Sequence, residues 1–458
     1  MEENKTQEKS ALFVATLTSF MGPFIISAVN VALPAIQTEF GVDAVKLGWI
    51  TTSLLLAVAV MLVPIGKIAD IHGRKKIFTW GLAIYTLATL LAGFAWSADA
   101  LILFRVFQGF GAAMFITTGM AILTSVFPPH KHGRAIGIYV AAVYIGLSAG
   151  PFVGGILTQQ LGWRSIFLIT VPLGAGSVYI TMKNLKGEWA DARGEKLDVT
   201  GSILYAVAIL TLVYGATLAP DAKALYLIAA GVICLGGFVR QELRTRYPVF
   251  EVRLFTNNKL FTFSSLAALI NYSATFAVTF LLSLYLQYIK GIAPQSAGTV
   301  LVAQPVMMAV FSPLAGKLSD RIEPRKLASA GMALTALGLL FFAMLSSRTS
   351  ILYIILNLAM LGFGFALFSS PNMHAIMGSV EKRLFGIASG AVATMRLLGQ
   401  MTSMAIAMVV LALYVGREEI TVVNYDLFLQ SVRVSFAIFA LLCTIGIFFS
   451  FSRGALRK

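Results

Sequence analysis

The chain of 458 residues consists of long apolar blocks separated by short polar stretches. A helix needs about 20 mostly apolar residues to cross the hydrocarbon core of a bilayer, which is about 30 Å thick. Fourteen blocks approach or exceed that length, the shortest being 224–239. The predicted spans are 11–33, 47–66, 77–96, 99–126, 135–158, 164–182, 199–219, 224–239, 260–286, 297–315, 327–346, 350–373, 385–413 and 432–452. The pattern predicts an all-α polytopic membrane protein.

The composition excludes several classes of protein. Hydrophobic residues make up 58% of the chain and charged residues only 12%, whereas soluble domains carry roughly 25% charged residues. A water-soluble globular protein and a disordered chain are therefore excluded. The sequence contains no Walker loop, no histidines at metal-ligand spacing and no nucleophile motif. We expect no cofactor, no enzymatic activity and no ATP-driven pumping.

The charged residues predict the orientation of the spans. Of the 35 Lys and Arg residues, 26 fall in loops on one side, seven in loops on the other, and two within spans. Because basic loops stay in the cytoplasm, both termini are expected there, in a multi-pass protein of the cell membrane. The net charge of +15 is explained by these short loops, so no nucleic-acid partner is expected. The first apolar block is interpreted as a retained span and not a signal peptide.

A short motif recurs in the two halves of the chain. Gly66-Lys67-x-x-Asp70 follows the second span, and Gly316-Lys317-x-x-Asp320 follows the tenth, 250 residues later. Such self-similarity indicates a transporter built from two related bundles. The second copy follows the tenth span and not the eighth, which indicates two inserted helices. The expected parts are a cytoplasmic tail (1–10), a six-helix bundle (11–182), a linker with two inserted helices (183–259), a second six-helix bundle (260–452) and a cytoplasmic tail (453–458).

Six motifs in the right order resemble those of the major facilitator superfamily, and in particular its fourteen-span drug:proton antiporter branch. The motifs are Asn30-x-x-x-Pro34, Gly66 to Arg74, Arg105-x-x-Gln108-Gly109-x-Gly111, Gly146-x-x-x-Gly150-Pro151-x-x-Gly154-Gly155, Trp163-Arg164-x-x-Phe167 and Asp198-x-x-Gly201. The resemblance implies the major facilitator fold and export of drugs. It differs at one position: proton-coupled members of the branch often carry an Asp where this chain has Ile25.

The loop after the second span is expected to act as a gate latch. Asp70 could cap the N-terminus of a neighbouring helix and pair with a nearby cation. Gly66, Gly73 and Arg74 belong to the same motif, and the two glycines are expected to allow close approach of the loop. By resemblance, the latch closes the inner side and stabilises the outward-open state, with Gly316 and Asp320 as the second copy. The alternative is a solvated loop that only sets topology.

Small residues recur along the fifth span at Gly146, Gly150 and Gly154, with Pro151 interrupting the helical hydrogen bonds. Small residues at this spacing allow close packing of helices. The functional hypothesis is a hinge or seal between the bundles, and the alternative is a simple packing seam.

Arg105 and Arg396 lie within spans, and no Asp or Glu lies well inside any span. A cation in the hydrocarbon is costly unless it faces the bundle interior or finds partners, such as carbonyls, Gln108, Gln400 or water. A cavity with two cations and no anion suits anionic or neutral amphiphiles. The alternative is two structural arginines bonded to carbonyls.

Other polar residues within the spans are candidates for lining a cavity or for bonding across helices. They are Asn30, Asn271, Tyr272, Gln304, Asn357, Asn372 and His374. His374 is the substitute candidate for a proton site, because histidine titrates near neutral pH. A satisfied structural histidine is the alternative.

The sequence therefore predicts a secondary active transporter that works by alternating access and exports amphipathic small molecules, with protons as the candidate coupling ion. Two alternatives stay open at this point: a facilitator or exporter of a specific anionic metabolite without proton coupling, and a non-transporting membrane sensor. The expected partners are a small-molecule substrate and the lipid bilayer, with a monomer as the default.

Overall fold

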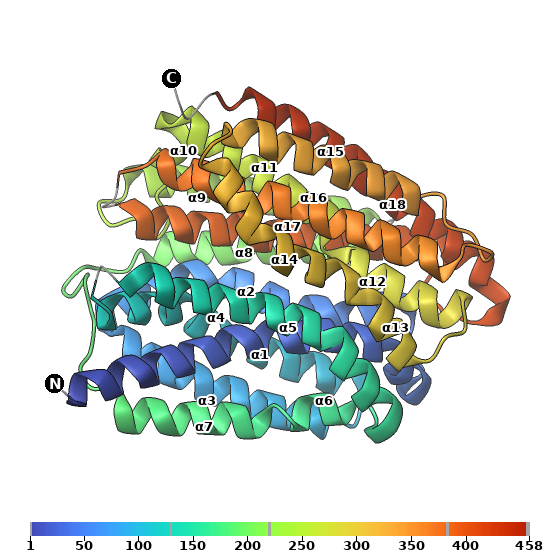
Figure 1. Cartoon of the computed structure of the whole chain (residues 1–458), viewed down its shortest axis with the longest axis horizontal. Coiled ribbons are helices and arrows are strands. Elements are labelled where there is room, and N and C mark those ends of the chain that lie inside the picture. The colour runs from blue at the N-terminus through green and yellow to red at the C-terminus, as the bar shows by residue number, and fades with distance from the viewer. Residues whose placement is uncertain (1, 129–130, 219–220, 382–383, 455–458) are drawn as a thin grey trace. The chain divides into compact units, whose positions relative to one another are not determined.

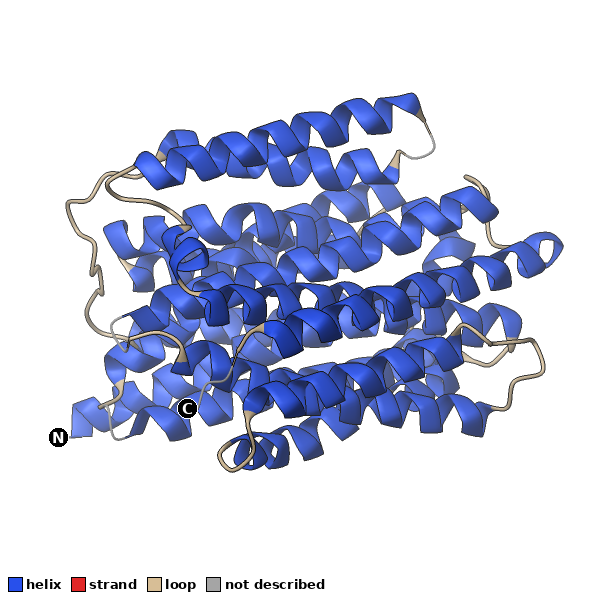
Figure 2. Ribbon diagram, turned by 90° about the horizontal axis from the view of Figure 1, so that it is seen from above, coloured by secondary structure: helices blue, strands red, loops and turns tan. Residues whose placement is uncertain are grey.

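The computed structural model describes residues 2–128, 131–218, 221–381 and 384–454, and all regular structure in these ranges is helical (Figure 2). Fourteen helical segments in these ranges are long and apolar enough to cross a membrane. Each corresponds to one of the fourteen predicted spans, including the short one at 224–239. The predicted all-α fold with fourteen spans is confirmed.

Most helices extend beyond the predicted spans. The helices are α1 (Glu2–Phe40), α2 (Ala44–His72), α3 (Arg74–Gly93), α4 (Ala98–Val126), α5 (His132–Leu161), α6 (Arg164–Leu168), α7 (Val171–Asn184), α8 (Val199–Thr217), α9 (Ala222–Arg244), α10 (Arg253–Asn257), α11 (Lys259–Thr275), α12 (Ala277–Leu284), α13 (Pro294–Leu301), α14 (Ala303–Ser319), α15 (Pro324–Phe342), α16 (Ile351–Gly378), α17 (Phe385–Tyr414) and α18 (Tyr425–Ser452). The expected tail at 1–10 is helical from Glu2 onwards. The expected loop after the second span is also helical as far as His72. Hydropathy marks where a segment turns polar, which is not where its backbone hydrogen bonds stop.

Three spans are interrupted, and each interruption has a local cause. Pro172 has no N–H for the carbonyl of Leu168, so the sixth span divides into α6 and α7. Pro305 in the same way separates α13 from α14. In the ninth span the N–H of Ala277 donates to the Oγ of Ser403 at 3.0 Å, an acceptor on α17, where α11 gives way to α12. A π-helical turn, Tyr285–Ile289, completes this span.

The chain divides into two compact units. Unit 1 contains residues 1–40, 49–210 and 233–249, and unit 2 contains residues 41–48, 211–232 and 250–458. The boundaries of the units at 210/211 and 232/233 fall within α8 and α9. Of the expected tail at 453–458, Arg453 and Gly454 are described, and residues 455–458 lie outside the described residues.

Unit 1 is built on two tight helix pairs. One is α1 with α5, which lie side by side in Figure 1, and the other is α3 with α4. In unit 2, α15 and α14 both pack on α16, and α11 packs on α17 and α18. An apolar cluster of Phe261, Ile376, Ala388, Ala391 and Val392 fills the space where α11, α16 and α17 meet.

Candidate functional site

The α2–α3 junction consists of a single residue, Gly73. Its φ angle is +115°, a conformation that residues with a side chain rarely adopt. A Cβ on Gly73 would lie 2.4 Å from Cδ of Glu188, so a side chain there would also collide with the segment that follows α7. Gly66 is different: it lies inside α2, and its nearest outside neighbour, Cγ2 of Thr117, is at the ordinary distance of 4.0 Å. The expectation of close approach holds for Gly73 and is wrong for Gly66.

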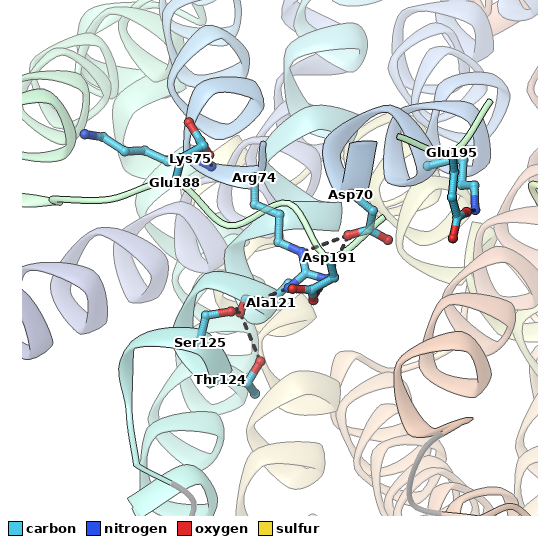
Figure 3. Close-up of polar contacts among 10 residues, drawn as sticks. Asp70, Arg74, Lys75, Ala121, Thr124, Ser125, Glu188, Asp191 and Glu195 are labelled. Carbon is cyan, nitrogen blue, oxygen red and sulfur yellow. Dashed lines mark hydrogen bonds and ion pairs between the residues drawn. The ribbon is translucent and has the colours of Figure 1, made fainter. Parts of the chain in front are cut away.

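Arg74, the first residue of α3, joins two carboxylates (Figure 3). Its Nη2 lies 2.7 Å from Oδ1 of Asp70, and its Nε donates to the same oxygen at 2.8 Å. Nη2 also lies 2.8 Å from Oδ2 of Asp191, in the connection between α7 and α8. The Arg74 side chain is 15% exposed, against 39% for Asp70 and 71% for Asp191, so the pair with Asp70 is the more sheltered of the two.

The connection between α7 and α8 is also bonded to the junction through its backbone. The N–H of Arg74 donates to the carbonyl of Trp189 at 2.8 Å, and the N–H of Ala192 donates to the carbonyl of Asp70 at 2.9 Å. We call residues 188–195 the strap. Nζ of Lys67 pairs with Oε2 of Glu195, which fixes the far end of the strap to α2.

The N-terminus of α3 is capped by Glu188. Its Oε1 accepts a hydrogen bond from the N–H of Lys75 at 2.7 Å, and its Oε2 accepts one from the N–H of Lys76 at 3.2 Å. A carboxylate at this position is stabilised by the helix dipole. Asp70 was expected both to cap a neighbouring helix and to pair with a nearby cation: among the described residues it pairs with Arg74, whereas the cap of α3 is provided by Glu188.

A second polar group of unit 1 surrounds Arg105, which is fully buried. Its Nε donates to the carbonyl of Ile50 at 3.1 Å, and its Nη1 donates to Oε1 of Gln108 at 2.9 Å. Nε2 of Gln108 donates to Oγ1 of Thr89 at 2.7 Å. The expected partners, a carbonyl and Gln108, are both present, whereas Nη2 of Arg105 has no hydrogen-bond partner within the described residues. Asn30 belongs to α1, and its Oδ1 accepts a hydrogen bond from Oγ1 of Thr51 at 3.0 Å.

The glycines of α5 pack against α1 within unit 1. A Cβ on Gly146 would lie 2.5 Å from the carbonyl oxygen of Phe20, and one on Gly154 would lie 2.6 Å from Cβ of Ala28. A Cβ on Gly150 would lie 2.8 Å from the carbonyl oxygen of Phe24. Pro151 is buried in the same helix. These contacts form a packing seam, and the hinge stays a hypothesis.

The second copy of the motif brings three predicted residues of unit 2 together. Nδ1 of His374 lies 2.8 Å from Oγ of Ser319 and 3.7 Å from Oδ1 of Asp320. Oγ of Ser319 in turn donates to the carbonyl of Gly316 at 2.7 Å. A Cβ on Gly316 would lie 3.5 Å from Oγ of Ser370, which is ordinary contact. Gly316 therefore has room for a side chain, as Gly66 has, and the contact of Asp320 with His374 is longer than the 2.7 Å pair of Asp70 with Arg74.

Four predicted residues lie in the middle of the unit 2 spans. Asn271 is fully buried, and both atoms of its amide have no hydrogen-bond partner among the described residues. Tyr272 stacks edge-on against Phe365, with ring centroids 5.5 Å apart. Gln304 is 8% exposed. Arg396 is half-buried, and no hydrogen bond or ion pair is recorded for it in the described part of the chain.

Sequence reasoning missed the acidic residues of the strap, Glu188, Asp191 and Glu195. A signal was present, since with Asp198 they place four of the 20 acidic residues within eleven positions of an otherwise basic side. It also missed Arg453, which was assigned to a tail although it is 2% exposed.

Comparison with known proteins agrees with this architecture. The model of the Major Facilitator Superfamily matches residues 12–240 and 264–455. The riboflavin transporter RibZ of Clostridioides difficile is 30% identical over 390 residues, covering 85% of either chain. The tetracenomycin C resistance and export protein of Streptomyces glaucescens is 31% identical over 396 residues, covering 85% of this chain and 73% of its own length.

Solved structures share the fold at low sequence identity. A crystal structure of the peptide transporter POT in complex with alafosfalin gives a TM-score of 0.70 at 12% identity, covering 96% of this chain and 97% of that one. A bacterial homologue of the human lysosomal transporter Spinster, in an inward-facing and unoccupied conformation, gives a TM-score of 0.69 at 19% identity, covering 98% of this chain and 97% of that one. With fourteen apolar helices in its described residues and a family match along most of its length, this chain is a multi-pass membrane transporter that belongs to the major facilitator superfamily.

Proposed function

We propose that the protein is a secondary active exporter of amphipathic small molecules with a neutral or anionic polar group, working by alternating access. It would lie in the cell membrane with both termini in the cytoplasm, as the distribution of basic residues indicates. The observation that carries the proposed substrate class is Arg396, a half-buried cation in the middle of a span, with no recorded partner in the described residues.

The position of Arg396 on α17 supports this role. It lies three residues before Gly399 and seven before Ser403, so all three occupy one side of the helix. A Cβ on Gly399 would lie 2.5 Å from the carbonyl oxygen of Leu269, and Ser403 binds the N–H of Ala277, so this side faces α11 and α12. Arg396 thus points to the helix-packed side of α17, where a partly exposed cation is stabilised by water or by a bound ligand.

The unsatisfied amide of Asn271 supports a polar site on the same helices. A buried amide without hydrogen bonds costs free energy that a bound ligand or water recovers. A Cβ on Gly399 would lie 2.8 Å from Cβ of Tyr272, the residue after Asn271, and the ring of Tyr272 packs edge-on against Phe365. A guanidinium, an amide and two aromatic rings suit a flat molecule with one polar end. The relatives include a riboflavin transporter and a tetracenomycin C resistance and export protein, each named for one organic compound.

We propose that protons are the coupling ion and that His374 takes them up. Protonation would turn its 3.7 Å contact with Asp320 into an ion pair. A facilitator without proton coupling is the second candidate. At the position where the branch often carries an Asp, this chain has Ile25, whose side chain cannot take up a proton.

The test of substrate class is transport in proteoliposomes with anionic, neutral and cationic amphiphiles of similar size. We expect saturable flux of anionic or neutral compounds, and a loss of at least roughly tenfold in the flux of the anionic ones for Arg396→Gln. Arg417→Gln, at an exposed position after the same helix, is the matched control. Selective transport of quaternary ammonium dyes, unaffected by anionic competitors, would refute the proposed substrate class.

A further inference from the structure

Among the described residues of unit 2, Arg453, which follows α18, is the most deeply buried charged group, with 2% of its surface exposed. Its Nη1 donates to Oδ1 of Asn372 at 2.6 Å and to Oγ of Ser264 at 3.3 Å. Nδ2 of Asn372 donates to the carbonyl of Ser264 at 3.0 Å, so α16 is bonded to α11 at the same point. One nitrogen of the guanidinium is therefore firmly placed.

The other two nitrogens of Arg453 are unsatisfied. Nε and Nη2 are buried and have no hydrogen-bond partner among the described residues. These two atoms form one edge of the guanidinium, on which two N–H bonds point the same way. That edge matches two oxygens of a single carboxylate or phosphate group. Buried donors of this kind are rarely left without an acceptor.

A second guanidinium lies close by at the start of α15. Nε of Arg325 is also buried without a hydrogen-bond partner among the described residues, and its guanidinium lies over the ring of Phe451, 5.6 Å from the centroid. Oγ of Ser329 donates to Oγ of Ser450 at 3.0 Å, one turn away on each helix. This bond holds the start of α15 against the end of α18.

The charged groups around Arg453 carry a net positive charge. Burial lowers the pKa of Arg453 to about 10, while the carboxylate of Glu323 raises it and the neighbouring Arg325 lowers it. Arg453 is therefore still cationic at neutral pH. One carboxylate offsets two guanidinium groups, which favours a further anion.

We propose that the start of α15 and the end of α18 form a binding site for an oxyanion, held by Nε and Nη2 of Arg453 together with Arg325. The headgroup of an anionic phospholipid and a free phosphate ion carry the same chemistry. The site shares no residue with the substrate site proposed around Arg396, and it does not depend on the transported substrate.

The test is the thermal stability of the purified full-length protein, since a ligand that binds the folded state raises its melting temperature. One arm compares sodium phosphate with sodium chloride at equal ionic strength in detergent. The other arm compares nanodiscs of phosphatidylglycerol with nanodiscs of phosphatidylcholine. We expect stabilisation in at least one arm, saturable in the phosphate arm. A phosphate response identifies a free anion, and a response confined to phosphatidylglycerol identifies a lipid.

Two variants separate this site from general charge effects. Arg453→Lys and Arg325→Lys keep the charge and remove the guanidinium edge. Each should therefore weaken binding of the anion roughly tenfold, seen as a smaller rise in melting temperature at the same anion concentration. Arg325 is only half-buried, so its variant remains informative where Arg453→Lys fails to fold. Arg417→Lys, at an exposed position, is the control and should respond as the unsubstituted protein does. The proposal is overturned if no anion stabilises the protein, or if both variants respond like the control.

Discussion

Oδ2 of Asp191 lies 2.8 Å from Nη2 of Arg74, so the connection after α7 is bonded directly to the first residue of α3. Together with the pairing of Asp70 to the same guanidinium, this ties three parts of unit 1 at one point (Figure 3). A conformational change that moves α2, α3 or the strap must either break these bonds or move the three parts together. The junction is therefore where we expect substitutions to alter transport most.

Asp70→Asn should slow transport more than Asp191→Asn. The Asp70 pair is more sheltered from water and is reinforced by the Nε hydrogen bond of Arg74, whereas Asp191 is mostly exposed. We expect about a fivefold loss for Asp70→Asn and less than twofold for Asp191→Asn, since exposed ion pairs contribute little. Initial rates in proteoliposomes at matched protein content measure this. Unchanged transport in Asp70→Asn would leave the junction without a role in gating.

Gly73→Ala should destabilise the protein by ~1–3 kcal/mol, because its backbone conformation is strained for any other residue. Combining Gly73→Ala with Glu188→Ala should cost less than the sum of the two single substitutions, because Glu188→Ala removes the collision, although it also removes the cap of α3 and leaves the strained φ angle. Gly137→Ala is the control: it lies in α5 with nothing within 4 Å, and should be neutral or stabilising by ~0.5–1 kcal/mol. The measurement is thermal unfolding in detergent of these variants and of the unsubstituted protein. Equal stability of Gly73→Ala and Gly137→Ala would contradict the account.

The seam between α1 and α5 can be distinguished from a hinge. Gly154→Ala should lower the melting temperature, and Ala28→Gly added to it should restore part of the loss by making room for the new methyl group. Pro151→Ala leaves the three glycines and their contacts with α1 unchanged. If the helix acts as a hinge, Pro151→Ala should slow transport at an unchanged melting temperature, and normal transport in that variant would leave only the packing seam.

Asp198, just before α8, should make stability depend on pH. Its burial raises the pKa, but hydrogen bonds from the N–H of Gly201 and from Thr245 and Gln241 outweigh this and hold the pKa below its ordinary value. A carboxyl group with a lowered pKa stabilises the folded state above its unfolded pKa of about 3.9, and this contribution is lost as the pH falls through the folded value. Asp198→Asn should therefore melt several degrees lower at pH 7, and the difference should shrink below about pH 4. A difference that is the same at every pH would show that the charge is not responsible.

His374→Gln should remove one step from the dependence of transport on pH, because the 3.7 Å contact with Asp320 becomes an ion pair only when the imidazole is protonated. Glutamine keeps a hydrogen-bonding group near Ser319, so packing is largely preserved. The measurement is transport rate between pH 5 and pH 8 at a constant membrane potential. Identical pH profiles in the two proteins would exclude His374 as the proton site.

The sequence predicts those features that depend on local spacing. Fourteen spans could be identified because lipid allows only long apolar helices to cross it. The pairing of Arg105 with Gln108 follows from their spacing of three residues, which places both on one side of α4. Contacts between residues far apart in the sequence could not be predicted in this way. Glu188 caps α3 from 113 positions away, and nothing in its own neighbourhood shows which helix it will meet.

The ends of spans were also poorly predicted, for a physical reason. Hydropathy records where side chains turn polar, whereas α2 continues to His72 through Lys67 and Asp70 because its backbone hydrogen bonds are intact. Arg453 shows the same limit. A basic residue after an apolar block is normally solvated, but here Asn372 and Ser264 hold it inside unit 2.

The central claim, secondary active export, is tested most directly in liposomes that contain the purified protein and an internal pH dye, without nucleotide. Amphiphiles of each charge class are added across an imposed pH gradient. The account predicts saturable flux of neutral or anionic amphiphiles, with protons moving in the opposite direction and with a strong reduction in Asp70→Asn. Flux and proton movement no greater than in protein-free liposomes, for every class of compound, would contradict it.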